Sequence, residues 1–159
     1  MLDPVPIPIQ EAVRDFFTDL LGRGVAATKR SAMSYDEDPL IVGRYLDDAG
    51  ETAALLVSDV DFAAFSGAAL AMIPKVVAAE AIKAGELSDN LFDNFREVVN
   101  VFSSLLNAPS TPHLVLKALE RHPEGTEDVV EIMETPRRRR DFDVTIEGYG
   151  SGVLAVLVR

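Results

Sequence analysis

The segment from Ser88 to Asn107 constrains the fold more than any other part of the chain. Its apolar residues recur every three or four positions, the spacing of a helix that packs one side against a core. These residues are Leu91, Phe92, Phe95, Val98, Val99, Phe102, Leu105 and Leu106. The other side carries Asp93, Glu97, Asn100 and Ser104, spaced so that they share one stripe. The pattern predicts an amphipathic helix running to about Asn107, with a polar stripe in solvent.

Residues that cap or break helices give the start of this helix and predict three further helices. Ser88 is a typical N-cap, and Leu87 and Phe92 are spaced to form a hydrophobic staple across it. Further helices are predicted over 9–21 with a stop at Gly22 or Gly24, from Asp61 as N-cap through Met72, and from Pro74 to Gly85. Apolar residues of the second, such as Phe62 and Phe65, are interpreted as core rather than as a ligand pocket.

Strand-like segments flank this helical block on both sides. They are 25–33, 40–46, 52–58, 114–119, 129–133, 142–146 and 153–158. The second and third are predicted to form one hairpin, and the last two another. Gly148, Gly150 and Gly152 between the last two resemble a dinucleotide-binding loop, but a strand rather than a helix follows them, which indicates a hairpin turn. Strands on either side of central helices predict an α/β (α+β) layered fold.

Size and charge restrict the possible functions. The 159 residues are expected to form a single domain, 1–159. The formal charge of −11 opposes binding to nucleic acid or to an anionic membrane, and favours a protein partner or a small solute. There is no cysteine, and His113 and His122 do not form a metal-spaced cluster, so no metal site is expected. Residues 1–10 lack the features of a signal peptide, and a cytoplasmic protein is expected.

The spacing Asp93-x-x-x-Glu97-x-x-Asn100 resembles the helix signature of the CheC/CheX/FliY family of response-regulator phosphatases. In that signature a Pro follows the Asn after twenty-two intervening residues, and Pro123 stands there in this chain. The alanine-rich helices that precede the motif also resemble the family, and the single motif is similar to that of CheX-type members. The resemblance implies a two-layer fold in which a mixed or antiparallel sheet packs against an N-terminal helix and a central pair of long helices.

The resemblance also implies a mechanism. Glu97 would pair with a lysine of a phosphorylated CheY-like receiver domain, and Asn100 would position the water that attacks the aspartyl phosphate. Asp93 and Ser104 would have auxiliary roles at the partner-binding surface. The chain would need no cofactor of its own, because the phosphorylated partner would supply Mg²⁺. A homodimer is a further expectation, since CheX-type relatives dimerise.

Two features leave alternatives open. Family members commonly have Gly four residues after the Asn, where this chain has Ser104, and the loss of Gly would alter the local backbone. A catalytically inactive dimerising scaffold or regulator-binding adaptor is therefore the alternative function. The basic run from Arg137 to Arg140 could bind phosphate, nucleic acid or the acidic surface of a receiver, but a solvated turn or sheet edge is the preferred interpretation.

Overall fold

The sheet at the centre of the molecule has six strands in the order β1-β5-β6-β3-β2-β4, and each neighbouring pair is antiparallel. The computed structural model describes residues 2–36, 39–122 and 126–159. The strands are β1 (Val25–Arg30), β2 (Leu40–Leu46), β3 (Thr52–Asp59), β4 (Val115–His122), β5 (Arg138–Ile146) and β6 (Gly150–Val158). The predicted β2–β3 and β5–β6 hairpins are both confirmed.

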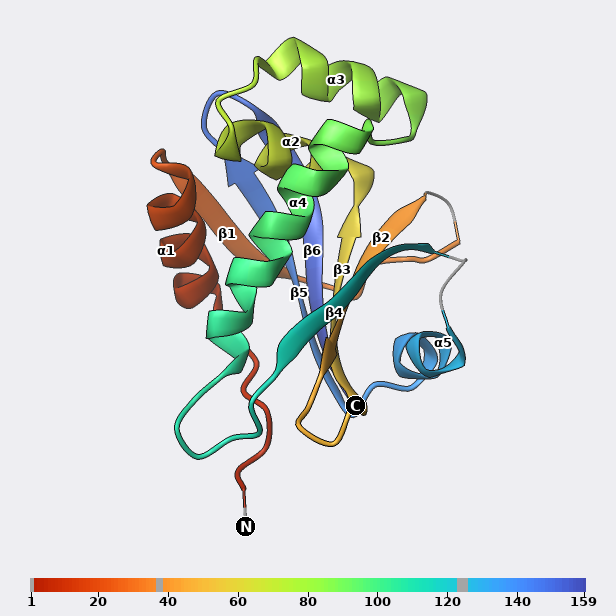
Figure 1. Cartoon of the computed structure of the whole chain (residues 1–159). Coiled ribbons are helices and arrows are strands. Elements are labelled where there is room, and N and C mark those ends of the chain that lie inside the picture. Colours follow the sequence, from red (N-terminus) through yellow and green to blue (C-terminus); the bar gives the residue numbers. More distant parts are fainter. Residues whose placement is uncertain (1, 37–38, 123–125) are drawn as a thin grey trace.

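The helices lie on both faces of this sheet. They are α1 (Gln10–Leu21), α2 (Val60–Leu70), α3 (Lys75–Ala84), α4 (Asp89–Phe102) and α5 (Glu127–Glu134), and a 3-10 turn η1 (Ser103–Leu106) extends α4. Figure 1 shows α1 and α4 crossing one face of the sheet, with α3 beyond α2 at one end. In the described part of the chain, no helix is long and apolar enough to cross a membrane.

Two hydrophobic clusters follow from the alternation of side chains along the strands. In β3, Ala54 and Leu56 belong to the larger cluster, which α1, α2 and α4 cover. Leu55 and Val57 point to the opposite face and pack with α5 in the smaller cluster. The central strand β3 is therefore buried on both sides. The antiparallel sheet with its N-terminal and central helices confirms the α+β layered fold predicted above.

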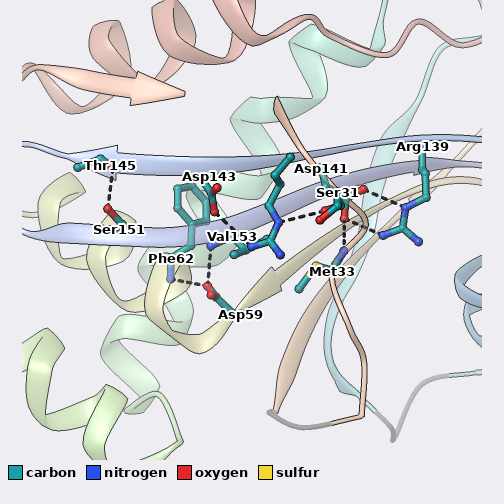
Figure 2. Close-up of polar contacts among 11 residues, drawn as sticks. Ser31, Met33, Asp59, Phe62, Arg139, Asp141, Asp143, Thr145, Ser151 and Val153 are labelled. Carbon is teal, nitrogen blue, oxygen red and sulfur yellow. Dashed lines mark hydrogen bonds and ion pairs between the residues drawn. The ribbon is translucent and has the colours of Figure 1, made fainter. Parts of the chain in front are cut away.

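Three predicted helix boundaries are wrong. The N-cap of α2 is Asp59 rather than Asp61, because the Asp59 carboxylate accepts a hydrogen bond from the Phe62 N–H at 2.8 Å (Figure 2). The same helix ends at Leu70 and not at Met72. The long amphipathic helix ends at Phe102, and only the 3-10 turn continues to Leu106.

The segment 129–133 is helical and not a strand. Its β-branched residues favour a strand locally. However, Val129, Ile132 and Met133 have helical spacing, and all three are buried against the smaller cluster. Tertiary packing of that apolar side therefore decides the conformation, and α5 forms.

Candidate functional site

The start of α4 is fixed by local sequence. The Ser88 hydroxyl accepts a hydrogen bond from the Leu91 N–H at 3.2 Å, which satisfies one of the free N–H groups at a helix N-terminus. Leu87 before the cap and Phe92 after it are both buried in the larger cluster. The predicted N-cap is confirmed, and it sets which side chains of α4 face the core.

Two glycines let α4 approach its neighbours closely. A Cβ atom at Gly67 of α2 would lie 3.0 Å from the Leu91 carbonyl oxygen, and one at Gly43 of β2 would lie 2.5 Å from Cγ1 of Val99. The Asn94 side-chain amide also donates to the Gly67 carbonyl at 3.1 Å. These contacts hold α4 against both α2 and the sheet, so the exposed side of α4 is built on a rigid support.

A buried tyrosine anchors the other end of the helix. The Tyr45 hydroxyl of β2 donates a 2.6 Å hydrogen bond to the Val99 carbonyl. At this point the N–H of Ser103 donates to the Asn100 carbonyl, three residues back, instead of to Val99, four residues back. Tyr45 thus satisfies a carbonyl that the change from α-helix to 3-10 turn releases. Asn100 follows directly on this anchored residue.

The predicted stripe is exposed. Asp93, Glu97, Asn100 and Ser104 all face solvent, the first three on α4 and Ser104 on the 3-10 turn. Asp93 forms an ion pair with Arg96 at 3.2 Å, and the Arg96 guanidinium lies over the Phe92 ring, 5.3 Å from its centroid. The side chains of Glu97 and Asn100 make no hydrogen bond or ion pair with any described residue. Both are therefore available to a partner.

A shallow depression of about 200 Å³ lies beside Glu97 and Asn100. Arg96 also lines it from α4, and β4 contributes Leu116, Lys117 and Ala118. Lys117 was not predicted from the sequence, because a single lysine in a strand is not distinctive until its neighbours in space are known. The structure therefore adds a cationic residue to the stripe.

Pro123, the remaining residue of the predicted motif, lies outside the described residues. The arginine run is not brought to this surface. A larger hollow of about 650 Å³ is formed by the N-terminal segment and the ends of β3, β5 and β6, away from the stripe, and Arg137, Arg138 and Arg159 line it. In residues 2–36, 39–122 and 126–159 there is no group of three or more His, Asp or Glu residues placed to hold a metal ion.

The arginine run is not a solvated turn, because residues 138–140 begin β5 and pair with β6. Arg138 donates to the Val5 carbonyl, and Arg140 donates to the carbonyls of Ile7 and Pro8 at 3.1 and 3.0 Å. The N-terminal segment is rich in proline, which lacks an N–H, so this segment cannot pair with β5 as a regular strand. The arginine side chains donate instead to its backbone carbonyls. These side chains have internal partners.

Arg139 points to the opposite face of the sheet. It donates twice to the buried Asp141 carboxylate, at 2.9 and 2.7 Å, and Asp141 also accepts from the Met33 N–H at 2.8 Å (Figure 2). The hydrogen bond to Asp141 raises the pKa of Arg139, so the guanidinium stays charged. This cluster fastens the segment between β1 and β2 to the sheet.

No protein-family model and no curated protein matches this sequence. Solved structures do match. The FliM middle domain from H. pylori superposes with a TM-score of 0.65 at 11% identity, covering 94% of this chain and 84% of that one. The corresponding values for the FliM middle domain from Vibrio alginolyticus are 0.58, 8%, 94% and 88%.

T. maritima FliY matches with a TM-score of 0.52 at 13% identity, covering 91% of this chain and 81% of that one. Identities this low establish a shared fold and not a shared activity. The resemblance drawn from the sequence is confirmed at that level. The chain has the fold of the CheC/CheX/FliY family, which FliM middle domains share.

Proposed function

We propose that this chain binds the receiver domain of a CheY-like response regulator and hydrolyses its aspartyl phosphate on the exposed side of α4. The observation that carries the proposal is the state of Glu97 and Asn100. Both are exposed and have no partner among the described residues, yet the helix that bears them is held by buried contacts at both ends. The backbone that bears these side chains is therefore held in place, and the side chains themselves are free to act on another protein.

The reaction suits this kind of surface. Water attacks the phosphorus of the acyl phosphate, the bond between phosphorus and the aspartyl oxygen breaks, and inorganic phosphate and a free carboxylate are released. In this proposal the Asn100 amide holds the attacking water in line with that bond, and Glu97 pairs with the receiver's lysine. The receiver brings the Mg²⁺ that neutralises the phosphoryl oxygens. Catalysis then comes from positioning and requires no residue with a shifted pKa on this chain.

Asp93 has a supporting role in the proposal. Its ion pair with Arg96 lies one turn before Glu97 and keeps Arg96 beside the depression. Because both partners are well exposed, the pair contributes little to stability. Asp93 is therefore assigned to orienting the partner rather than to the reaction. Ser104 lies on the 3-10 turn beyond the helix and is assigned to the rim of the same surface.

A second candidate function is binding without catalysis, as an adaptor or a dimerising scaffold. It is favoured by the higher TM-scores of the FliM middle domains, 0.65 and 0.58, compared with 0.52 for FliY. Solved structures of FliM from H. pylori also include complexes with SpeE and with FliG, which match this chain at 11% and 14% identity. On this account the exposed side of α4 would dock a partner protein and Asn100 would have no chemical role.

The experiment that separates these functions follows the decay of phosphorylated receiver domains from the same genome, with and without the protein. We expect acceleration by the unaltered chain and about a hundredfold loss of that acceleration in Asn100→Ala, comparable to the removal of one transition-state hydrogen bond. Glu97→Ala should lose acceleration and also bind the receiver more weakly. Asn90→Ala is the matched control, since Asn90 is exposed on the same helix but does not line the depression beside Glu97 and Asn100.

Receiver binding without acceleration would favour the second candidate. Acceleration that persists in Asn100→Ala would contradict the residue assignment. If the chain neither binds nor accelerates any available receiver, both candidates fail.

A further inference from the structure

The geometry points to Lys117 as a contact for the phosphoryl group of the partner, so that β4 and α4 together distinguish the phosphorylated from the unphosphorylated receiver. This inference rests on the proposed function and adds a residue from a different element. It begins with an irregularity in β4. Ala118 is paired with Arg44 of β2, but the next residue of β2, Tyr45, is paired with Leu116. Lys117 is therefore the extra residue of a β-bulge.

The bulge has a cause in the sequence. Leu116 and Leu119 are three residues apart, and in a regular strand side chains at that separation point to opposite faces. Both nevertheless pack against the larger hydrophobic cluster. One inserted residue corrects the alternation, and Lys117 is the residue that the correction takes out of the regular pattern. Bulges are frequent on edge strands and beside active sites, where they redirect a side chain.

The redirected lysine lines the depression that Glu97 and Asn100 line from α4. It is exposed, and it forms no ion pair with any described residue. The other cation of the depression, Arg96, is already paired with Asp93. Lys117 is thus a positive charge with no ion-pair partner among the described residues, in a chain whose formal charge is −11.

The negative charge of Glu97 explains why a cation is needed at this position. A phosphoryl group that approached Glu97 with no cation on this side would be repelled by the carboxylate. An ammonium group is a compact charge with three donors and binds phosphate oxygens without the planar geometry that arginine requires. Lys117 would offset the repulsion only when the phosphate is present. It would therefore contribute to the affinity for the phosphorylated receiver and not for the unmodified one.

A structural role for Lys117 gives a different expectation. Lysines and bulges on a terminal strand also prevent one sheet from pairing with another, and β4 is the last strand of this sheet. In that case the loss of the charge would promote association of the protein with itself and leave the preference for phosphorylated receiver unchanged.

The test measures the affinity of the full chain for one receiver domain, first unmodified and then carrying beryllium trifluoride and Mg²⁺ as a phosphoryl mimic. For Lys117→Gln we expect binding of the mimic-bearing receiver to weaken about three- to tenfold, and binding of the unmodified receiver to change less than twofold. Lys117→Arg should keep most of the preference. Lys83→Gln removes the same charge from an exposed position on α3 and should change neither affinity.

Equal weakening towards both receiver forms, or none towards either, would overturn the inference. The unaltered chain tests the proposed function separately. If it accelerates the decay of the receiver's phosphate, the proposed function is supported whatever the result for Lys117→Gln. Size-exclusion chromatography of each variant monitors self-association. If Lys117→Gln associates, Lys117→Glu and Lys117→Arg are compared instead, because both keep a charge on the terminal strand, and loss of preference in the first alone supports the inference.

Discussion

The polar stripe of α4 and the arginine run of β5 are both conspicuous in the sequence, but in the structure their side chains differ in whether they bond to other groups of the protein. Arg138, Arg139 and Arg140 each donate to groups of this chain. Glu97 and Asn100 on α4 have no partner among the described residues. The arginines therefore hold segments of the fold together, whereas no side-chain bond among the described residues ties Glu97 or Asn100 to the fold. Only the second situation suits a surface that acts on another protein.

This contrast has an energetic basis. A polar group whose partner is removed in a buried place costs the free energy of its lost solvation, but an exposed group regains water. Substitutions around the arginine run should therefore lower the free energy of unfolding, and substitutions on the stripe should not.

The largest loss is expected for Asp141→Ala. The Asp141 carboxylate is 3% exposed and accepts three hydrogen bonds, two from Arg139 and one from the Met33 N–H. Alanine leaves these donors without their acceptor, and we expect the free energy of unfolding to fall by about 2–4 kcal/mol in denaturant titrations. Asp143→Ala is the control on the same strand. Its ion pair with Arg30 is more exposed, so the loss should stay below about 1 kcal/mol. Equal losses would contradict the contrast.

The next effect belongs to Tyr45→Phe, which removes the 2.6 Å hydrogen bond to the Val99 carbonyl without changing the ring. We expect a loss of about 1–2 kcal/mol near neutral pH, because the buried carbonyl is left unsatisfied. If this bond also positions Asn100, receiver dephosphorylation should slow while receiver binding is kept. Unchanged stability would show that a water replaces the hydroxyl.

The pH dependence of the same pair of proteins gives an independent check. Burial raises the pKa of the Tyr45 hydroxyl well above its ordinary value of 10.0. In the unfolded chain the hydroxyl ionises near pH 10, but in the folded protein it stays neutral, so its contribution to stability is complete below that pH and is lost as the pH rises further. Unfolding titrations above pH 10 should therefore show the unaltered protein losing stability faster than Tyr45→Phe.

The structural elements that could be predicted from the sequence are those that depend on residues close together in the chain. The Ser88 cap, the amphipathic α4 and both hairpins follow from patterns within a few residues, and all are present. The helix α5 could not be separated from a strand, because its β-branched residues fit both and only packing on the second face of the sheet decides. The extent of α4 also depends on Tyr45, which lies 54 residues away from Val99.

The candidate site was predictable only in part. The stripe itself follows from helical spacing, and its exposure agrees with that prediction. The chemical roles of Glu97 and Asn100 stay predictions. Lys117 was missed because a bulge is a property of two paired strands. The solvated turn predicted for the arginine run is wrong because Arg138 and Val5 are 133 positions apart, and no local pattern records a contact over that distance.

A smaller effect is expected for Arg140→Gln. Arg140 donates to the carbonyls of Ile7 and Pro8 at a partly buried position, where water replaces part of what is lost, so the expected loss is about 1 kcal/mol. The change should be local. Hydrogen exchange at the amide of Val13, which donates to the Ile9 carbonyl at the start of α1, should accelerate, while exchange in α4 stays as in the unaltered protein. Arg137→Gln is the control from the same run, since Arg137 is exposed and its side chain bonds to no described residue. Acceleration in both variants would assign the effect to net charge.

The smallest effect on stability is expected on the stripe, and its sign is informative. Asparagine is a weaker helix former than alanine by about half a kcal/mol, and Asn100 gains no compensating hydrogen bond within the described chain. Asn100→Ala should therefore leave the free energy of unfolding unchanged or raise it by up to about 0.5 kcal/mol, and Glu97→Ala should change it by less. A loss above about 1 kcal/mol for either would give the stripe a structural role and remove its contrast with the arginine run. A neutral or stabilising change would mean that folding does not require these residues. An interaction with a partner protein would then be the remaining reason for Asn100, a poor helix former, at the exposed end of a well-anchored helix.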